Sequence, residues 1–196
     1  MSPRSAIKNQ EIRQETMVKI MDAAFSLIAR QGYESTSISQ IARKAGISKG
    51  LLYNYFLSKE ALLEKLIQNA MSQGEQIVAT SFTDDPAKTL ENLFRRFFRE
   101  LRERPEYWRL LTELTLKIDK FKFVHDIAVE KMTAYTELLR HLFVQLGVED
   151  PAGEAKLVAA VFDGIGMQAV VIKQDYPLDE LERILIRKYC NRKITQ

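Results

Sequence analysis

The chain has 196 residues, one cysteine and a formal net charge of +3 at neutral pH. This length allows one domain or two small ones with a substantial core, and a lone cysteine excludes an intrachain disulfide. No run approaches eighteen consecutive apolar residues and the N-terminus lacks a signal-peptide core, so we expect a cytoplasmic protein with no membrane partner.

The charge is unevenly distributed. Residues 1–60 hold nine Lys and Arg against five Asp and Glu, and the remainder holds twenty against twenty-one. The basic excess therefore lies in the first third of the chain, which is compatible with a nucleic-acid partner there. Ordinary scatter in a segment of this length would give a similar surplus.

Apolar residues at helical spacing predict a first helix over 11–31, ended by Gly32. Three serines then predict three helix starts. Ser37 with Gln40 forms a capping-box pattern, Ser48 caps the next helix, and Ser58 caps a third. Gly46 ends the helix that starts after Ser37. Two helices joined by a short turn form the helix-turn-helix unit, whose second helix enters the major groove of DNA.

The second helix of this unit has the side chains of a DNA reader. Leu52 and Phe56 are expected to point inward. Asn54 is the best candidate for reading a base, because asparagine pairs bidentately with an adenine edge. Lysine, serine and tyrosine side chains and free backbone N–H groups bind phosphate. The predicted DNA-binding residues are Thr36, Ser37, Ser48, Lys49, Gly50, Leu51, Tyr53, Asn54, Tyr55 and Lys59. A surface helix with aromatic packing residues would give a similar pattern.

The rest of the chain also has helical periodicity. Helices are predicted over 58–72, from Asp85-Pro86 to 104, from Pro105 to 118, over 123–146, over 154–174 and over 178–191. No strand alternation appears, so the predicted fold class is all-α. We expect a DNA-binding domain over 1–57 and a second helical domain over 58–196.

One ordered set of residues runs through the first third of the chain: Ala24-Phe25, Gly32-Tyr33, Thr36, Ile41-Ala42, Ala45-Gly46, Ser48, Gly50, Leu52-Tyr53, Tyr55-Phe56, Lys59 and Leu62. Through these residues, the segment 15–62 resembles the DNA-binding domain of the tetracycline-repressor-like (TetR) family of bacterial transcriptional regulators. Leu51 departs from the pattern, because members often carry Thr, Ser or another small residue there; a leucine would instead contact a thymine methyl. The remainder resembles the family in length and helical periodicity.

The resemblance implies a repressor that a small-molecule effector releases from a palindromic operator, with the effector pocket in the C-terminal helical domain. Aromatic residues are concentrated over 94–135, as expected of a pocket for a lipophilic or aromatic effector, although such residues also simply fill a core. No catalytic, metal or cofactor motif accompanies them, so we expect no enzyme. The predicted effector residues are Phe94, Phe97, Phe98, Leu101, Trp108, Leu111, Thr112, Thr115, Tyr135 and Gln168.

The resemblance also implies a homodimer formed by the last two helices. Residues 155–171 are apolar nearly all round, as in a helix buried on more than one side, and 178–189 are amphipathic. Burial against the chain's own core is the alternative. The predicted interface residues are Val158, Ala159, Phe162, Gly166, Leu181, Ile184 and Leu185. The alternative function is a helical protein-interaction module, which would lack the steep salt dependence of DNA binding.

Overall fold

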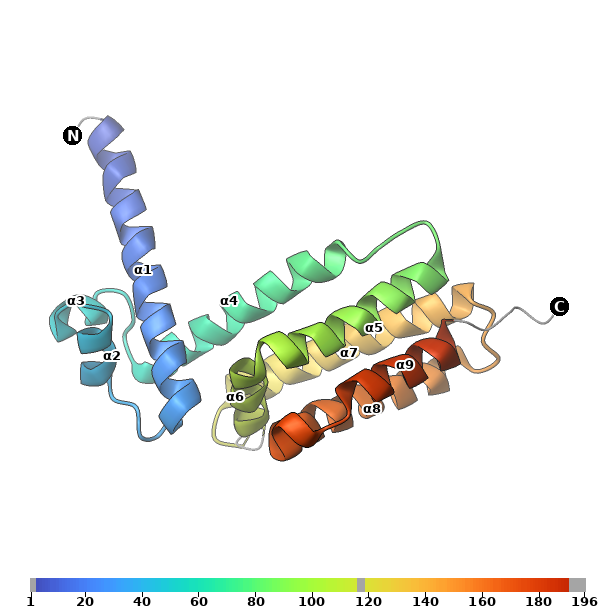
Figure 1. The fold of residues 1–196 in the computed structure, drawn as a ribbon. Helices are drawn as coiled ribbons and strands as arrows, with labels where there is room; N and C mark the ends of the chain where they lie inside the picture. The colour runs from blue at the N-terminus through green and yellow to red at the C-terminus, as the bar shows by residue number, and fades with distance from the viewer. Residues whose placement is uncertain (1–2, 116–118, 191–196) are drawn as a thin grey trace. The chain divides into compact units, whose positions relative to one another are not determined.

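The computed structural model describes residues 3–115 and 119–190. All regular structure in these two ranges is helical, which confirms the predicted all-α class (Figure 1). The chain divides into two compact units, Met1–Gln73 and Gly74–Gln196. The division falls inside a helix, α4 (Lys59–Ala79), whereas the domain boundary predicted from the sequence lies just before that helix.

The first unit contains α1 (Pro3–Gln31), α2 (Ile38–Lys44), α3 (Lys49–Tyr53) and the first turns of α4. Helix α1 begins at Pro3 and not near residue 11 as predicted. Helix α2 contacts both α1 and α3. The core of this unit is made of aliphatic side chains with no exposed surface, namely Ile20, Ala24, Ile41, Leu52, Leu62 and Leu63.

Local side-chain hydrogen bonds set the helix starts of this unit, as the serine positions predicted. The backbone N–H of Gln40 donates to Ser37 Oγ at 3.2 Å, and that of Ser37 donates back to Gln40 Oε1 at 2.7 Å. Ser48 Oγ caps α3 by accepting from the Leu51 N–H at 3.1 Å. Gly46 takes a φ of +70°, which a residue with a side chain rarely adopts, and so ends α2.

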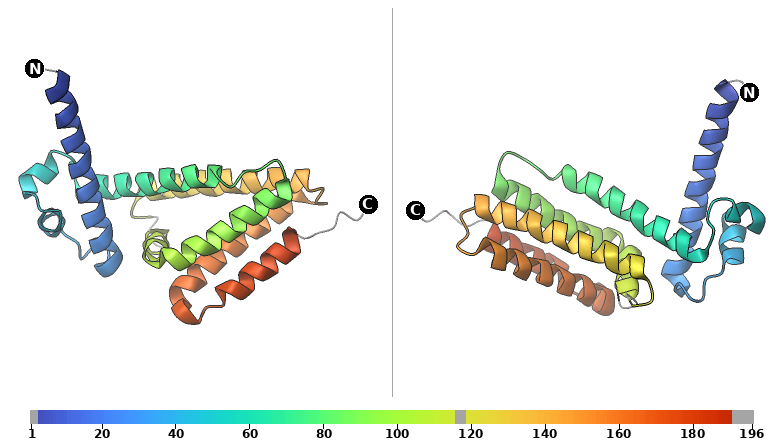
Figure 2. Two further views of the ribbon diagram at one scale, coloured as in Figure 1. Left: turned by 45° about the horizontal axis from the view of Figure 1, so that its top comes forward. Right: turned by 180° about the vertical axis from the view of Figure 1, so that it is seen from behind.

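The second unit is a helical bundle. Helices α5 (Pro86–Glu103), α7 (Lys122–Gln145), α8 (Pro151–Ile172) and α9 (Leu178–Tyr189) run beside one another (Figures 1 and 2). The shorter α6 (Pro105–Thr115) contacts α5, α7 and α8, and a 3₁₀ turn, η1 (Lys173–Asp175), follows α8. Helix α8 starts earlier than predicted, because Asp150 caps it by accepting the Gly153 N–H at 2.9 Å.

Helix α8 has an unusual surface for a bundle helix. With η1 it spans Pro151–Asp175, and within the described part of the chain it is the one helix that meets the length and apolarity of a membrane span. Only 28% of its most apolar window is buried within the chain. A core helix of a bundle can pass the same test, and α8 packs against α6 and α7. Much of its apolar surface is therefore left uncovered within the chain.

Candidate DNA interface and effector region

Helix α3 exposes the surface that the sequence predicted. Lys49, Gly50 and Asn54 are exposed, and Leu51 and Tyr53 retain 39% and 42% of their accessible surface. The opposite side of the turn is anchored, because Leu52 is fully buried and Phe56 is 6% exposed. These anchors fix the direction in which the outward residues point. Their contacts with DNA stay a prediction.

The helix itself has five residues, and Asn54 lies at its C-terminal cap and not within it. The Asn54 backbone N–H donates to the Leu51 carbonyl oxygen at 3.1 Å. The backbone of Asn54 is therefore held by the helix while its side chain extends into solvent. Such a position suits a short side chain that must approach a base edge closely.

Cations accompany the two tyrosines of this surface. Lys49 Nζ lies 5.9 Å from the centre of the Tyr53 ring. The guanidinium carbon of Arg13 lies 5.3 Å from the centre of the Tyr55 ring, and Tyr55 is half-buried. A hydroxyl beside a cation suits a phosphate oxygen, which accepts from both. Arg13 was not predicted, because it lies on α1 and no local motif connects it to Tyr55.

Two of the predicted phosphate contacts have internal roles instead. Thr36 is 1% exposed, and its hydroxyl donates to the Gly32 carbonyl oxygen at 2.8 Å. Lys59 Nζ donates to the carbonyl oxygens of Tyr33 at 2.9 Å and Thr36 at 3.0 Å. We therefore revise the prediction for Thr36 and Lys59: both connect the α1–α2 turn to the start of α4. Ser37 and Ser48 are exposed N-caps whose Oγ atoms each accept a backbone N–H, and their contacts with DNA stay a prediction.

Six of the ten predicted effector residues belong to one hydrophobic cluster of the second unit, namely Phe94, Phe97, Phe98, Leu101, Trp108 and Tyr135. Phe97 stacks on Phe162, with ring centres 4.3 Å apart and planes at 10°. Phe97 also meets Trp108 edge to face at 5.5 Å, and Tyr135 lies 6.1 Å from Phe162. Phe94, Phe98 and Leu101 are buried, Phe97, Trp108, Leu111, Thr112 and Tyr135 are half-buried, and Thr115 and Gln168 are exposed.

Most polar groups of this cluster are already used. Thr112 and Thr115 each donate a hydroxyl to a carbonyl oxygen four residues earlier in α6, at 2.9 Å. Gln168 accepts the Tyr176 hydroxyl at 3.0 Å. Burial raises the pKa of Tyr135, and the Asp163 carboxylate raises it further, so the phenol is neutral. The Trp108 Nε1–H is buried without a hydrogen-bond partner in the described residues.

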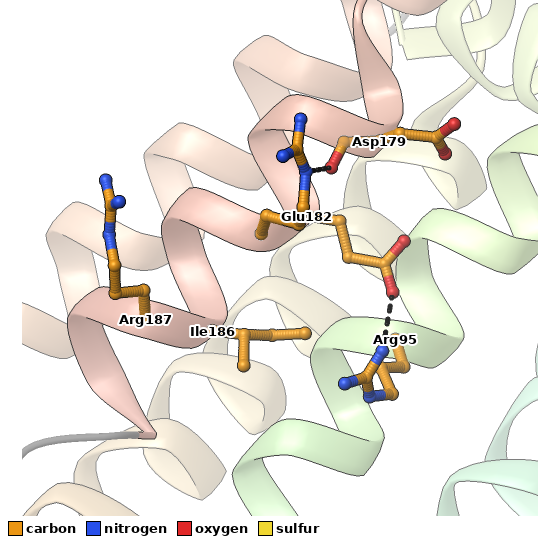
Figure 3. Close-up of a pocket in the computed structure, with 6 residues that line it drawn as sticks. Arg95, Asp179, Glu182, Ile186 and Arg187 are labelled. Atoms are coloured by element: carbon orange, nitrogen blue, oxygen red, sulfur yellow. Dashed lines mark hydrogen bonds and ion pairs between the residues drawn. The ribbon is translucent and has the colours of Figure 1, made fainter.

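A separate depression of about 350 Å³ lies between α5 and α9. Figure 3 shows charged side chains of both helices that line it, together with Ile186 of α9. Arg95 of α5 reaches Glu182 of α9 at 3.5 Å, and Arg102 binds Asp179 at 2.7 Å. These ion pairs join α5 to α9, so the charged side chains around the depression have a structural role in the bundle. The predicted effector residues lie outside it.

Three of the predicted interface residues of α8 lie in the interior of their own chain, so we revise the prediction for them. Val158 is fully buried and Phe162 is 4% exposed, both within the core of their own chain, and Gly166 lies under Trp108. The opposite face of α8 is exposed and consists of Leu157, Ala160, Gly164, Met167 and Val171, with Gly164 half-buried. Of the remaining predicted residues, Leu185 is buried, Ala159 and Leu181 are half-buried, and Ile184 is 39% exposed.

Comparison with known proteins gives matches over most of the chain. The family described as "Bacterial regulatory proteins, tetR family" matches residues 20–66, and "Tetracyclin repressor-like, C-terminal domain" matches residues 82–188. A relative from Bacillus subtilis, the "Uncharacterized HTH-type transcriptional regulator YwcC", is 27% identical over 85% of this chain and 82% of its own length.

Solved structures share the fold. A TetR transcription regulator from Haloarcula marismortui superposes with a TM-score of 0.80 at 19% identity, over 90% of this chain and 97% of that one. The FadR regulator of Bacillus subtilis, solved in complex with stearoyl-CoA, gives a TM-score of 0.72 at 22% identity, over 89% of this chain and 97% of that one.

Proposed function

Because this chain belongs to the tetR family of bacterial regulatory proteins and is a DNA-binding transcriptional regulator, we propose that it is a repressor. In this proposal a homodimer binds a palindromic operator in the cytoplasm and leaves it when a small molecule binds the C-terminal unit. Residues 1–57 read the DNA, and residues 58–196 bind the effector and the second subunit.

The outward surface of α3 carries the DNA-binding part of the proposal. Asn54 reads a base, and Lys49 with Tyr53 binds the phosphate backbone. Leu51, at 39% exposure, presents a methyl-rich side chain to the groove and suits a thymine methyl. Arg13 and Tyr55 supply a further phosphate contact, which replaces the contacts first expected of Thr36 and Lys59.

The exposed face of α8 carries the dimer part of the proposal. Leu157 is 50% exposed, Met167 52% and Val171 68%, and all three lie on the side of α8 away from the core. Ala160 and Gly164 lie between them, and their small side chains allow a second helix to approach closely. Two copies joined there would present two copies of α3, as a two-fold operator requires with half-sites about 34 Å apart.

The aromatic cluster supports an effector site of apolar character. Its members come from α5, α6, α7 and α8, and three of its aromatic side chains are half-buried and so reach the surface. A solved regulator of the same fold, FadR, is described in complex with stearoyl-CoA. Binding of an effector at such a cluster would shift operator affinity by a coupling of about 1–3 kcal/mol, the usual size for such switches.

Selection of binding sites from random duplex DNA tests the proposal. We expect a palindrome to be enriched, and its affinity to fall steeply with salt because the protein displaces counterions from phosphates. Random DNA of the same length serves as the control. Equal affinity for both, or binding that is insensitive to salt, would favour the alternative of a helical protein-interaction module.

A further inference from the structure

The indole N–H of Trp108 is a buried hydrogen-bond donor that makes no hydrogen bond within the described residues. More than nine in ten buried polar groups in folded proteins are paired, because an unpaired buried donor has lost its bonds to water and gained nothing. A donor left in this state needs a physical reason.

The described surroundings of the Trp108 ring are aromatic side chains and the backbone of α8. The ring of Trp108 is flanked by Phe97 at 5.5 Å and Tyr107 at 6.3 Å, both edge to face. On the side of α8 a Cβ at Gly166 would lie 3.4 Å from the six-membered ring, so the indole rests directly on the helix. The hydroxyls of Thr112 and Thr115, on the same helix, already donate to backbone carbonyls of α6.

Building on the proposed function, we propose that the effector is an uncharged apolar molecule with a hydrogen-bond acceptor, such as a ketone or ester, and that the Trp108 indole donates to that oxygen. The apolar rings bind the body of the ligand, and the indole N–H fixes its orientation. A site with one polar anchor in an apolar lining is the usual design of small-molecule pockets.

The charge of the ligand follows from the groups that face the cluster. Asp163 lies next to Phe162 in the chain, and its carboxylate raises the pKa of Tyr135. Arg104 lies over the ring of Tyr107, the neighbour of Trp108, at 4.7 Å and reaches Glu100 at 3.3 Å, so its charge is compensated. A buried anionic ligand would be repelled by the Asp163 carboxylate, and Arg104 is already paired with Glu100. A neutral carbonyl needs only the indole N–H.

Three aromatic side chains of the cluster, Phe97, Trp108 and Tyr135, are half-buried, and the indole nitrogen itself is covered. The ring of Phe97 contacts both Trp108 and Phe162. In our proposal an aromatic ligand displaces the Phe97 ring and takes over its stacking on Phe162.

Trp108 is the single tryptophan of the chain, so one indole cross-peak in a ¹H–¹⁵N spectrum of the full-length protein reports on it. We would titrate two matched pairs of probes, acetophenone with ethylbenzene and benzophenone with diphenylmethane. Each pair differs in a carbonyl oxygen and little in shape. The ketones are expected to move the indole proton downfield, and the hydrocarbons to leave it near its original position.

The variant Trp108→Phe keeps an aromatic ring and removes the N–H. It should bind the ketones about 5–10-fold more weakly than the wild type and the hydrocarbons with unchanged affinity, since one neutral hydrogen bond is lost. Glu106→Gln, at an exposed position of the same helix, is the control and should match the wild type. Equal indole shifts within each pair, unchanged ketone affinity in Trp108→Phe, or no binding of any of the four probes would overturn the proposal.

Operator titrations on the same samples separate this inference from the proposed function. If the selected palindrome is bound specifically and the ketones fail at Trp108, the ligand class is wrong and the regulator stands. If no specific DNA is bound, the proposed function fails whatever the indole resonance does. Ketones that weaken operator binding of the wild type more than that of Trp108→Phe would support both.

Discussion

The ammonium group of Lys59 lies 4.0 Å from the centre of the Tyr33 ring and donates a 2.9 Å hydrogen bond to the carbonyl oxygen of the same residue. A second hydrogen bond, to the Thr36 carbonyl oxygen, completes the arrangement at 3.0 Å. The first residue of α4 therefore closes the turn between α1 and α2, and its charge is stabilised by carbonyl dipoles and a π face.

We predict that Lys59→Met lowers the free energy of unfolding by about 2–4 kcal/mol, because charge-assisted hydrogen bonds and a cation–π contact are lost together. Urea denaturation followed by circular dichroism measures the change. Lys65→Met, at an exposed position of the same helix, should stay within about 0.5 kcal/mol of the wild type. A Lys59→Met protein of normal stability whose DNA binding has a shallower salt slope would restore the phosphate role.

Asn54→Ala is expected to weaken binding to the selected operator by about 1–3 kcal/mol and to relax preference at one base pair. Lys49→Ala should behave differently, weakening operator and random DNA alike and reducing the salt slope by about one. Fluorescence anisotropy at several salt concentrations distinguishes the two. Retention of full operator affinity and sequence preference in a folded Asn54→Ala protein would rule out base reading by this residue.

Two glycines of α8 give a matched test of the dimer face. A Cβ at Gly164 would meet no atom within 4 Å, whereas one at Gly166 would contact the Trp108 ring. We predict that Gly164→Glu gives a folded monomer, since the charge enters the proposed interface while the helix itself gains propensity. Gly166→Glu should instead destabilise the fold by about 3–5 kcal/mol, because its charge is buried without a partner.

Analytical ultracentrifugation and thermal unfolding of both variants decide this point. Gln145→Glu, at an exposed position of α7, controls for added charge and should remain dimeric and stable. A dimeric Gly164→Glu protein would exclude this face of α8. The monomer should also bind the operator much more weakly than the wild type, because each chain carries one copy of α3.

Cys190 is predicted to be unreactive at neutral pH. Burial, with a further contribution from the Glu91 carboxylate, raises the pKa of its thiol from 9.0 to about 12. Alkylation by iodoacetamide at pH 8 should therefore be about 1000-fold slower than for a free thiol, since the thiolate is the nucleophile. Rapid alkylation of the folded protein would contradict the burial of this side chain.

The same shift has a consequence for stability at high pH. Below pH 9.0 the Cys190 thiol is protonated in both the native and the unfolded state, and the native state keeps its full stability. Between pH 9.0 and about 12 the thiol ionises in the unfolded state first, so the free energy of unfolding falls as the pH rises. Cys190→Ala should therefore lose less stability than the wild type between pH 9 and 12. Tyr33 and Tyr107, whose pKa values are also raised by burial, remain in both proteins and contribute equally.

The helix starts could be predicted from the sequence because their causes are local. Ser37 and Gln40 bond to each other's backbone across three residues, and the Asp85 carboxylate accepts the backbone N–H of Ala87, just after Pro86. The outward direction of α3 also followed from the sequence, since Leu52 and Phe56 are spaced to point the same way. Such interactions require no knowledge of the rest of the fold.

The role of Lys59 and the exposed face of α8 could not be predicted, for two different reasons. Lys59 binds the carbonyl of a residue 26 positions earlier, and backbone acceptors leave no mark in side-chain patterns. Helix α8 is apolar on both sides, so its periodicity does not distinguish the face that contacts α5, α6 and α7 from the one left uncovered. Only the packing of the aromatic cluster makes that choice.

The shortness of α3 affects how mutations in this protein would appear in a genetic screen. Five residues form less than two turns, too few for a helix that persists in water without tertiary contacts. Its backbone amides should then exchange with deuterium only when the Leu52 and Phe56 anchors are released, at the rate at which the whole first unit opens. Changes deep in the core of α1, such as Ile20→Ala, would therefore derepress target genes as effectively as changes in α3, without touching the DNA.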